Sequence, residues 1–163
     1  MREMTCDDYG NLCNILKDPE VMYAYEGAFS DIEVRQWLDR QIERYKNDGF
    51  GLWAVILKDT REFIGQCGIT VQEYKESHVH EIGYLFNKKF WHRGYATEAA
   101  IACRKYAFTR LNTDCIYSII RDSNIASQNV ALRNGMNAVD KIIKYYRNAD
   151  MPHIVFVAVK YHP

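Results

Sequence analysis

The feature that most constrains this chain is the segment at residues 90–100, FWHRGYATEAA, which follows the alternating run EIGYLF and opens a helical pattern. A glycine at such a strand-to-helix junction permits a left-handed backbone and lets N–H groups approach a ligand closely. The first turn of a helix leaves backbone N–H groups without partners and carries a partial positive charge, which suits a phosphate. The segment therefore predicts an anion-binding loop between a strand and a helix.

This loop matches neither of the two commonest phosphate-binding motifs. A Walker loop ends in Gly-Lys-Ser/Thr, and the dinucleotide fingerprint needs three spaced glycines. Residues 93–98 read RGYATE and contain one glycine. We therefore expect a different phosphate-bearing cofactor.

The N-terminal third of the chain carries helix signals. Thr5 with Asp8 and Ser30 with Glu33 have the spacing of capping boxes, so each pair predicts the start of a helix. The second of these helices should end at the Asn-Asp-Gly segment that follows Lys46. An Asp-Pro pair predicts a short additional helix over residues 18–25.

The middle of the chain switches to the period of β-strands. GLWAVILK and EFIGQCGITVQ are rich in β-branched and aromatic residues and predict a hairpin with its turn at residues 58–61. A strand over residues 79–86 places Glu81 and Leu85 on one face and Ile82 and Phe86 on the other. This strand leads directly into the anion-binding loop.

The C-terminal half continues with a strand, a helix and a hairpin. Residues 115–121 read as a buried strand, and the next helix should begin after Asn124 and stop at Gly135. Strands over residues 138–146 and 153–161 flank a turn at residues 147–150. The order of strands and helices predicts an α/β domain with a partly parallel arrangement.

Composition limits the classes of function. A length of 163 residues suits one domain, spanning 1–163. The net charge of zero indicates no nucleic-acid or anionic-membrane partner. Five cysteines without a Cys-x-x-Cys pair favour neither a disulfide framework nor a metal site. No apolar h-region follows Met1 and no long apolar run occurs, so we expect neither a secretory signal nor a transmembrane span. We expect a soluble cytoplasmic protein, monomeric or homodimeric, that binds small molecules or peptides.

Two windows resemble the GNAT acetyltransferases. The first, Trp91 to Ala96, is similar to motif A of the family, whose pyrophosphate loop Gln/Arg-x-x-Gly-x-Gly/Ala binds the diphosphate of acetyl-coenzyme A. Trp91 replaces the usual Gln or Arg, and the form Trp-x-x-Gly-Tyr-Ala-Thr-Glu-Ala resembles the RimJ/RimL-like branch of ribosomal-protein N-terminal acetyltransferases. The second, NIASQNVALRNGM, is similar to the family's Asn-x-x-Ser, helix and Gly-Phe pair, with Met136 in place of Phe.

The resemblance implies the GNAT fold, which is classed as α/β or, in some schemes, α+β. We expect a mixed, mostly antiparallel sheet of about six strands flanked by helices, in which a central parallel pair carrying Glu81 and Ile119 splays apart. Chains of this branch usually begin with an extended strand, but only three residues precede Met4 here. The first strand should therefore be missing or vestigial.

The resemblance also implies acetyl-coenzyme A as cosubstrate. Its pantetheine arm should enter the splay and bond to the backbone near Tyr84, Leu85 and Phe86. Its diphosphate should lie on the loop, and the second window should add further contacts. The cofactor-binding residues on this prediction are Tyr84, Leu85, Phe86, His92, Arg93, Gly94, Tyr95, Ala96, Thr97, Asn124, Ser127 and Asn129.

The implied activity is direct acetyl transfer from the thioester to a primary amine, either a protein or peptide N-terminus or a small amine. Such a transfer needs a neutral amine, a polarised carbonyl and a proton for the departing thiolate. Two alternatives stay open. One is an acyl-coenzyme A sensor or inactive interaction module on the same fold; the other is a small-molecule acetyltransferase acting on amino acids, polyamines or aminoglycosides.

Three residues are candidates for catalysis. Glu81 is the leading candidate for the general base, because the family often places a base on this strand and burial can raise the pKa of a carboxyl; a structural ion pair is the competing interpretation. Glu26 is the second candidate, in a loop that usually contacts the acceptor, although a solvated loop carboxylate would look the same. Ser127 is the candidate for protonating the thiolate, against an ordinary residue of a first helical turn.

Overall fold

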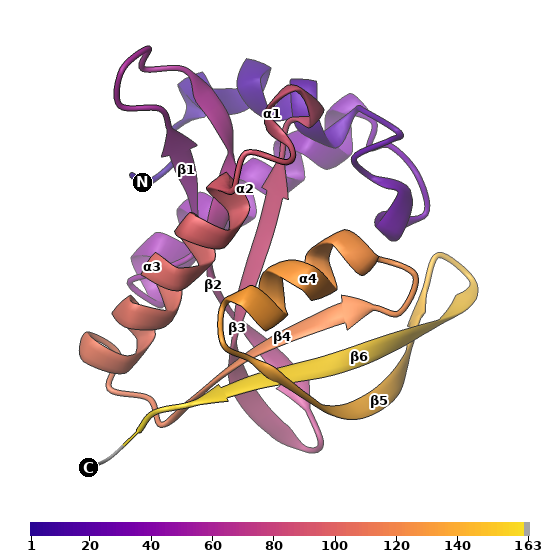
Figure 1. The fold of residues 1–163 in the computed structure, drawn as a ribbon. Helices are drawn as coiled ribbons and strands as arrows, with labels where there is room; N and C mark the ends of the chain where they lie inside the picture. Colours follow the sequence, from indigo (N-terminus) through magenta and orange to yellow (C-terminus); the bar gives the residue numbers. More distant parts are fainter. Residues whose placement is uncertain (162–163) are drawn as a thin grey trace.

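Six strands form one mixed sheet in the computed structural model, which describes residues 1–161 (Figure 1). The strand order is β1-β2-β3-β4-β6-β5. Only β3 and β4 are parallel neighbours, and the other pairs are antiparallel. The predicted mixed sheet with a central parallel pair is confirmed. The strands are β1 (Leu52–Ile56), β2 (Phe63–Tyr74), β3 (Ser77–Phe86), β4 (Cys115–Arg121), β5 (Asn137–Tyr146) and β6 (Ala149–Val159).

Four α-helices and three short 3-10 turns accompany the sheet. The capping box at Ser30 starts a helix as predicted: Glu33 Oε2 accepts from the Ser30 N–H at 2.7 Å, and Ser30 Oγ accepts from the Glu33 N–H at 3.3 Å. The elements are η1 (Cys6–Asp8), α1 (Tyr9–Leu16), η2 (Tyr23–Tyr25), α2 (Asp31–Asn47), η3 (Lys88–Phe90), α3 (Tyr95–Thr109) and α4 (Ile125–Arg133).

The predicted helix over residues 18–25 is wrong. Asp18 does not cap a helix there; its carboxylate accepts from the Glu20 N–H at 2.8 Å and fixes a turn. Only the last three residues, in η2, form a single 3-10 turn. Local side-chain bonding of Asp competes with helix formation, and here it prevails.

The two hairpins that close β2–β3 and β5–β6 are tighter than the sequence pattern predicted. Their turns are Lys75–Glu76 and Arg147–Asn148, and all four residues have positive φ, between 47° and 61°. Two left-handed residues in succession are typical of a two-residue type I′ turn, which usually contains glycine. These turns contain no glycine, so the sequence pattern did not indicate them. As a result, β3 and β6 begin earlier in the structure than the pattern predicted.

The sheet is buried on both faces. Helices α3 and α4 cover one face, in front of the sheet in Figure 1, and α1 and α2 cover the other. Along β3, Ile82 and Phe86 pack in the core between the sheet and helices α3 and α4. Leu85 packs against the core between the sheet and helices α1 and α2, as the alternation predicted. This arrangement places Glu81 on the face of α2. Within residues 1–161, no helix combines the length and the apolar composition needed to cross a bilayer.

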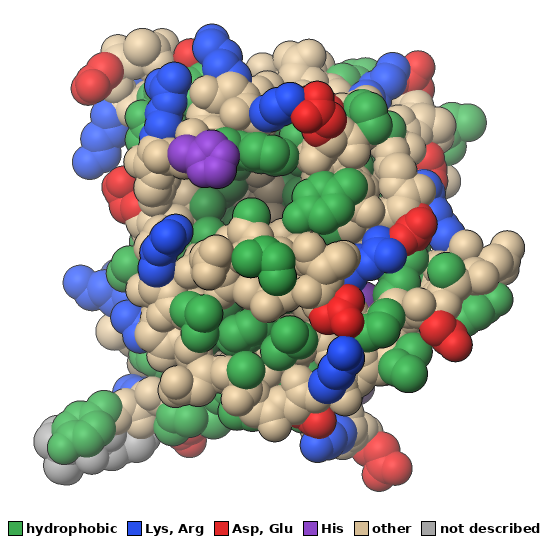
Figure 2. Space-filling model, turned by 45° about the vertical axis from the view of Figure 1, so that its right-hand side comes forward, with side chains coloured by type: hydrophobic (Ala, Val, Ile, Leu, Met, Phe, Trp, Pro, Cys, Tyr) green, Lys and Arg blue, Asp and Glu red, His purple; other side chains and the backbone are tan. Residues whose placement is uncertain are grey.

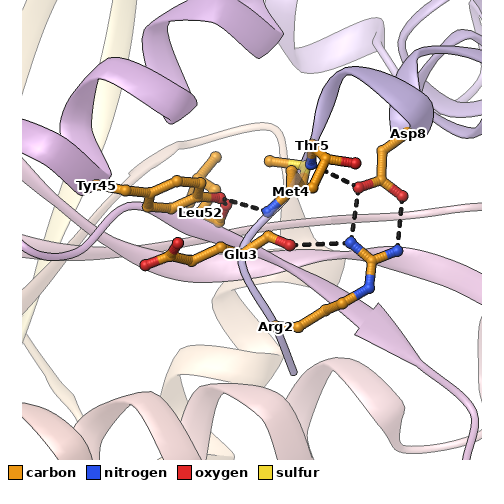
Figure 3. A network of polar contacts seen from close by, with 7 residues as sticks. All are labelled: Arg2, Glu3, Met4, Thr5, Asp8, Tyr45 and Leu52. Carbon is orange, nitrogen blue, oxygen red and sulfur yellow. Dashed lines mark hydrogen bonds and ion pairs between the residues drawn. The ribbon is translucent and has the colours of Figure 1, made fainter.

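The first strand expected from the family resemblance is reduced to one bridge. Arg2 pairs with Ala54 of β1 through two backbone hydrogen bonds of 3.1 and 2.8 Å. Side chains then hold the N-terminus in place (Figure 3): the buried Asp8 carboxylate accepts from both Nη atoms of Arg2, at 2.7 and 2.8 Å, and from the Thr5 N–H at 2.9 Å. Although burial alone would raise the pKa of Asp8, these bonds lower it below its usual range.

Tyr45 of α2 attaches the same segment to the sheet (Figure 3). Its hydroxyl accepts from the Met4 N–H at 3.2 Å and donates to the Leu52 carbonyl of β1. Burial, as the main cause, raises the pKa of Tyr45 to about 12, so the hydroxyl stays neutral. The N-terminal segment thus joins α2 to β1 without forming a full strand.

Candidate active site

The parallel strands β3 and β4 separate immediately after one pair, Glu81 opposite Tyr117 (Figure 1). Two side chains bond across the gap where a regular ladder would have backbone bonds. Glu81 Oε1 accepts from the Ile119 N–H at 2.9 Å, and the buried Ser118 Oγ donates to the Ile82 carbonyl at 2.9 Å. The splay is therefore stabilised by a carboxylate and a hydroxyl, which satisfy groups that the missing ladder would leave unpaired.

A cavity of about 440 Å³ lies beside this splay. It is bounded by the segment around η2, by α2, by β2 to β4, by the C-terminal hairpin and by the start of α4. Of the predicted site residues, the cavity brings together Glu81, Tyr84, Leu85, Asn124 and Ser127. The candidate residues that the sequence predicted on β3 and at the start of α4 thus line the same cavity.

Glu81 is the only carboxylate that lines this cavity among the described residues. Burial raises its pKa above the usual range, while Lys144, the bond from the Ile119 N–H and Arg44 oppose that shift. Desolvation favours the neutral form of a carboxyl, and nearby cations favour the charged form. A carboxyl with a raised pKa that lines a cavity is a candidate proton acceptor.

The hydroxyl of Tyr84 connects β3 to the first turn of α4. It donates to the Ser127 carbonyl at 2.7 Å, and the Ser127 N–H donates to Asn124 Oδ1 at 3.0 Å. Asn124 caps α4 as predicted, and its Oδ1 also accepts from the Tyr23 hydroxyl at 2.8 Å. Burial strongly raises the pKa of Tyr84, so its hydroxyl retains its proton throughout the neutral range.

The predicted anion-binding loop has the backbone conformation that the glycine suggested. Gly94 has φ of +83° and is the N-cap of α3, and His92 also has positive φ, at +60°. A Cβ at Gly94 would meet no atom within 4 Å, so the space beside it is open. No side chain caps the helix, which leaves the N–H groups of its first turn available to an anion.

A shallow groove runs beside this loop and contains a residue that the sequence did not indicate. Arg133, from α4, faces the loop across the groove and has no ion-pair partner among the described residues. Its position depends on the packing of α4 near α3, for which the sequence carries no signal. The groove is lined by His92, Gly94, Thr97, Glu98, Ile101 and Arg133.

Trp91, the departure from the family pattern, anchors the loop to the strand before it. Its indole Nε1 donates to the Phe86 carbonyl at 2.9 Å. The Phe86 carbonyl, predicted to bond pantetheine, therefore already accepts a hydrogen bond within the protein. Two further side chains of the loop pack on Phe90: Arg93 lies over the Phe90 ring at 5.7 Å, and Tyr95 packs against the same ring.

Glu26 and Asn129 are not brought into the cavity. The Glu26 residue is exposed, has φ of +58°, and its carboxylate forms an ion pair with Arg121. Its carbonyl accepts from Arg147 Nη1 at 3.2 Å, which fixes the loop to the C-terminal hairpin. Asn129 is exposed on α4 and lines neither the cavity nor the groove. Of the two candidate carboxylates, Glu81 lines the cavity and Glu26 does not.

Further cavity residues come from elements that sequence reasoning did not connect with Glu81. Tyr25 lies in η2, and burial strongly raises the pKa of its hydroxyl, with Glu81 adding to the shift. Arg44 of α2 and Lys144 of β5 lie close enough to oppose the rise in the pKa of Glu81. No spacing in the sequence signals these residues, because they meet only when α2 and the last hairpin pack around the splay.

On the face of the molecule shown in Figure 2, basic and acidic side chains are interspersed, and no large patch of like charge is formed. Among residues 1–161, no three His, Cys, Asp or Glu side chains gather closely enough to hold a metal ion.

Comparison with known proteins places the chain in a family. Residues 1–137 match the Acetyltransferase (GNAT) domain. YkkB of Bacillus subtilis (strain 168) is 37% identical over 146 residues, which cover 89% of this chain and 85% of YkkB. The N-acetyltransferase YnaD of the same organism is 31% identical over 137 residues, covering 83% of this chain and 77% of YnaD.

The fold also matches a solved structure of the ribosomal-protein branch. RimL, described as a ribosomal L7/L12 alpha-N-protein acetyltransferase in complex with coenzyme A, superposes with a TM-score of 0.79 at 16% identity. The match covers 97% of this chain and 92% of RimL, and it shows the shared fold. With its domain match and its relatives, the chain belongs to the GNAT family of acetyltransferases and is an acyltransferase.

Proposed function

We propose that this protein transfers the acetyl group of acetyl-coenzyme A directly to a primary amine, on a protein or peptide N-terminus or on a small molecule. The observation that carries the proposal is the position of Glu81, a carboxylate with raised pKa that lines a cavity at the splay of β3 and β4. The strand that carries it leads to an uncapped helix start with an open, left-handed glycine. Strand β3 thus connects the proposed proton acceptor, Glu81, to the proposed anion-binding loop.

The residues of the loop and groove fit the phosphate-bearing end of the coenzyme. The N–H groups of residues 92–97 would bind the diphosphate, and the guanidinium of Arg133 would add a charge. The pantetheine arm would lie in the splay beside Tyr84 and Leu85, near the cap residue Asn124. When bound, the coenzyme supplies an acetyl thioester, whose carbonyl carbon is the electrophile.

Acetyl transfer forms one N–C bond and breaks one C–S bond, so one proton must leave the nitrogen and one must reach the sulfur. The Glu81 carboxylate accepts the proton of the amine, and a hydroxyl at the start of α4 supplies the other. Tyr84 is the stronger donor candidate, because it lines the cavity and its hydroxyl stays protonated at the start of α4; the proton that it now donates to the Ser127 carbonyl would have to turn toward the sulfur. Ser127 remains the second candidate.

Thiol release from acetyl-coenzyme A, measured against peptides, amino acids, polyamines and aminoglycosides, tests the proposal. Acceptor-dependent release with a stoichiometric acetylated product is the expected result. Tight coenzyme binding without transfer to any acceptor would instead favour an acyl-coenzyme A sensor on this fold.

Substitutions at Gly94 test the coenzyme site separately. Asp and Asn both tolerate the left-handed backbone and have nearly the same size, so Gly94→Asn is a matched control for Gly94→Asp. The carboxylate of Gly94→Asp would repel the diphosphate, whereas the amide would not. We expect calorimetry to show at least tenfold weaker coenzyme binding for Gly94→Asp than for Gly94→Asn. Equal affinities in folded variants would place the diphosphate elsewhere.

A further inference from the structure

The cavity wall carries more positive charge than its one carboxylate can neutralise. Arg40 and Arg44 from α2 and Lys144 from β5 line it, and Glu81 is the only acidic residue in the lining among the described residues. Arg121 also lines the cavity, but it forms an ion pair with Glu26. The cavity therefore has a net positive wall.

The three cations Arg40, Arg44 and Lys144 form no salt bridge within residues 1–161. The charges of Asp48 and Glu81 act on Arg44, and that of Lys144 acts on Glu81. Arg44 Nη1 donates to the neutral Gln41 Oε1 at 3.1 Å, and Arg40 lies over the Trp37 ring at 5.8 Å. Burial and the neighbouring Arg40 lower the pKa of the half-buried Arg44. Salt bridges outside this group are formed by Arg2, Lys17, Lys75, Lys88, Lys89, Arg121, Lys141 and Arg147.

Contacts of α2 with the sheet place Arg44 level with Glu81. Trp37 Nε1 donates to Gln66, which is opposite Leu85. One turn later, Gln41 accepts from the Leu52 N–H, and Leu52 lies beside Gly68, itself opposite Gly83. The next turn brings Arg44 to the level of Glu81. Its charge and that of Lys144, from β5, both act on the Glu81 carboxyl.

These cations are far from the loop that would hold the diphosphate. That loop begins beyond Phe86, at the end of β3, whereas Arg44 is level with Glu81. Five strand residues span about 16 Å at about 3.3 Å per residue. The coenzyme's phosphates on the loop would therefore not balance the charges of Arg44 and Lys144. Among the described residues of the cavity lining, Glu81 is the one carboxylate that offsets both of them. A half-buried cation whose charge is only partly balanced is costly, so an anion from another source is expected there.

We infer that the acceptor amine carries a negatively charged group, a carboxylate or a phosphate, a few bonds from its nitrogen, and that Arg40, Arg44 and Lys144 bind this group. The inference rests on the proposed function and names the acceptor class for the same site. The anion lies between α2 and β5 while the amine faces Glu81. Polyamines and aminoglycosides, which are polycations, are repelled by this wall.

Matched acceptor pairs that differ in one charge test this inference and identify the source of the anion. Amino acids against their α-amides report on an α-carboxylate. Peptide amides beginning with Glu or Asp against Gln or Asn report on a side-chain carboxylate, and phosphoethanolamine against ethanolamine reports on a phosphate. We expect kcat/KM to be at least tenfold higher for the anionic member of at least one pair, and the ratio to shrink as salt screens the charges.

Variants then connect the preference to the cations. Arg44→Gln and Lys144→Gln, on different elements, should each lower the ratio of kcat/KM within the preferred pair at least threefold, and Lys144→Glu should reverse it. Coenzyme affinity should not change. Arg35→Gln is the control on α2, since Arg35 stacks over Tyr9 and does not line the cavity, and Lys141→Gln is the control on β5.

Binding without turnover separates this inference from the proposed function. Glutarate and its uncharged diamide serve as probes for calorimetry with the coenzyme-bound protein. Binding of glutarate alone, lost in Arg44→Gln and Lys144→Gln, would support the anion site even if no acceptor were acetylated. Failure of glutarate to bind in preference to the diamide, together with equal kcat/KM within every pair, would overturn the inference while transfer itself could still be observed.

Discussion

Replacement of Glu81 by glutamine isolates the proton-accepting role of that side chain. The amide Oε1 can still accept from the Ile119 N–H, which is 2.9 Å from the carboxylate in the native protein, and the two side chains have nearly equal volume. The splay of β3 and β4 should therefore persist. What disappears is the charge and the ability to take a proton from the amine.

The expected loss in turnover follows from the role. A positioned general base typically contributes about 10²-fold to 10⁴-fold to the rate, which corresponds to about 3–5 kcal/mol at 1.36 kcal/mol for each factor of ten. We expect Glu81→Gln to lower kcat by this factor and to remove one ionisation from the acid limb of the kcat/KM profile. Coenzyme affinity, measured by calorimetry, should be nearly unchanged because the loop at residues 92–97 is separate.

The thermal stability of Glu81→Gln shows whether the variant folds, and the raised pKa of Glu81 predicts the direction in which its stability should change. Burial raises the pKa of Glu81 in the folded protein, so the native state loses stability as pH rises from the unfolded value, about 4.3, through the folded value. At neutral pH the glutamine variant avoids this cost and should melt at or above the wild-type temperature. The difference should narrow toward pH 4, where the wild-type carboxyl is protonated.

The outcome that refutes this reasoning is an unchanged kcat together with an unchanged acid limb. An acceptor amine that itself sets the acid limb would mimic a base, so the profile must be compared between acceptors of different basicity. A variant that is inactive and melts below wild type at pH 7 would contradict the assignment of a buried, destabilising carboxyl. Unaltered turnover would transfer the base role to Glu26 or to water.

The remaining predictions concern the proton donor and the N-terminal anchor. If the Tyr84 hydroxyl supplies the proton to sulfur, Tyr84→Phe should lower kcat about 10²-fold or more while Ser127→Ala lowers it less, and single-turnover kinetics with both variants would detect the reverse order if Ser127 is the donor. Asp8→Asn should destabilise the protein by about 1–3 kcal/mol at pH 7, because it weakens the bonds from Arg2 and Thr5. The pKa of Asp8 is lowered in the fold, so its stabilisation is present above the unfolded pKa and is lost as pH falls through the folded value. Thermal unfolding at pH 7 and pH 3 should show the gap between variant and wild type closing in acid, and a gap that stays constant would exclude this role.

Local sequence patterns determined the helices with side-chain caps and the strand that carries the site. The Ser30 and Glu33 pair, the Asn124 cap and the alternation along β3 each involve residues no more than a few positions apart, so their geometry is set by the backbone period. The glycine loop is equally local: Gly94 has positive φ at the start of α3, as its position after a strand predicted. The fold followed from these patterns together with the family resemblance.

Local sequence patterns predicted the wrong structure where a short segment can form either a turn or part of a helix or strand. Asp18 bonds to the backbone of Glu20 and forms a turn in place of a helix, and Lys75–Glu76 adopts a tight turn without glycine. At both places the residue types do not by themselves select the turn. The packing of the neighbouring elements therefore determines which conformation the backbone adopts. Strand ends and short helices were accordingly less predictable than capped helices.

The chemistry of the cavity was decided by tertiary structure. Glu81 meets the Ile119 N–H across 38 positions of sequence, and Tyr84 meets the Ser127 carbonyl across 43. Arg44 and Lys144 line the same cavity from α2 and β5, 100 positions apart in the sequence. Periodicity carries no information about such pairs, because it reports which face of an element is buried and not which elements meet. The sequence therefore determined the strand that holds the carboxylate, and the packing of α2, α4 and the last hairpin around the splay determined its pKa, its hydroxyl neighbours and the positive wall that faces it.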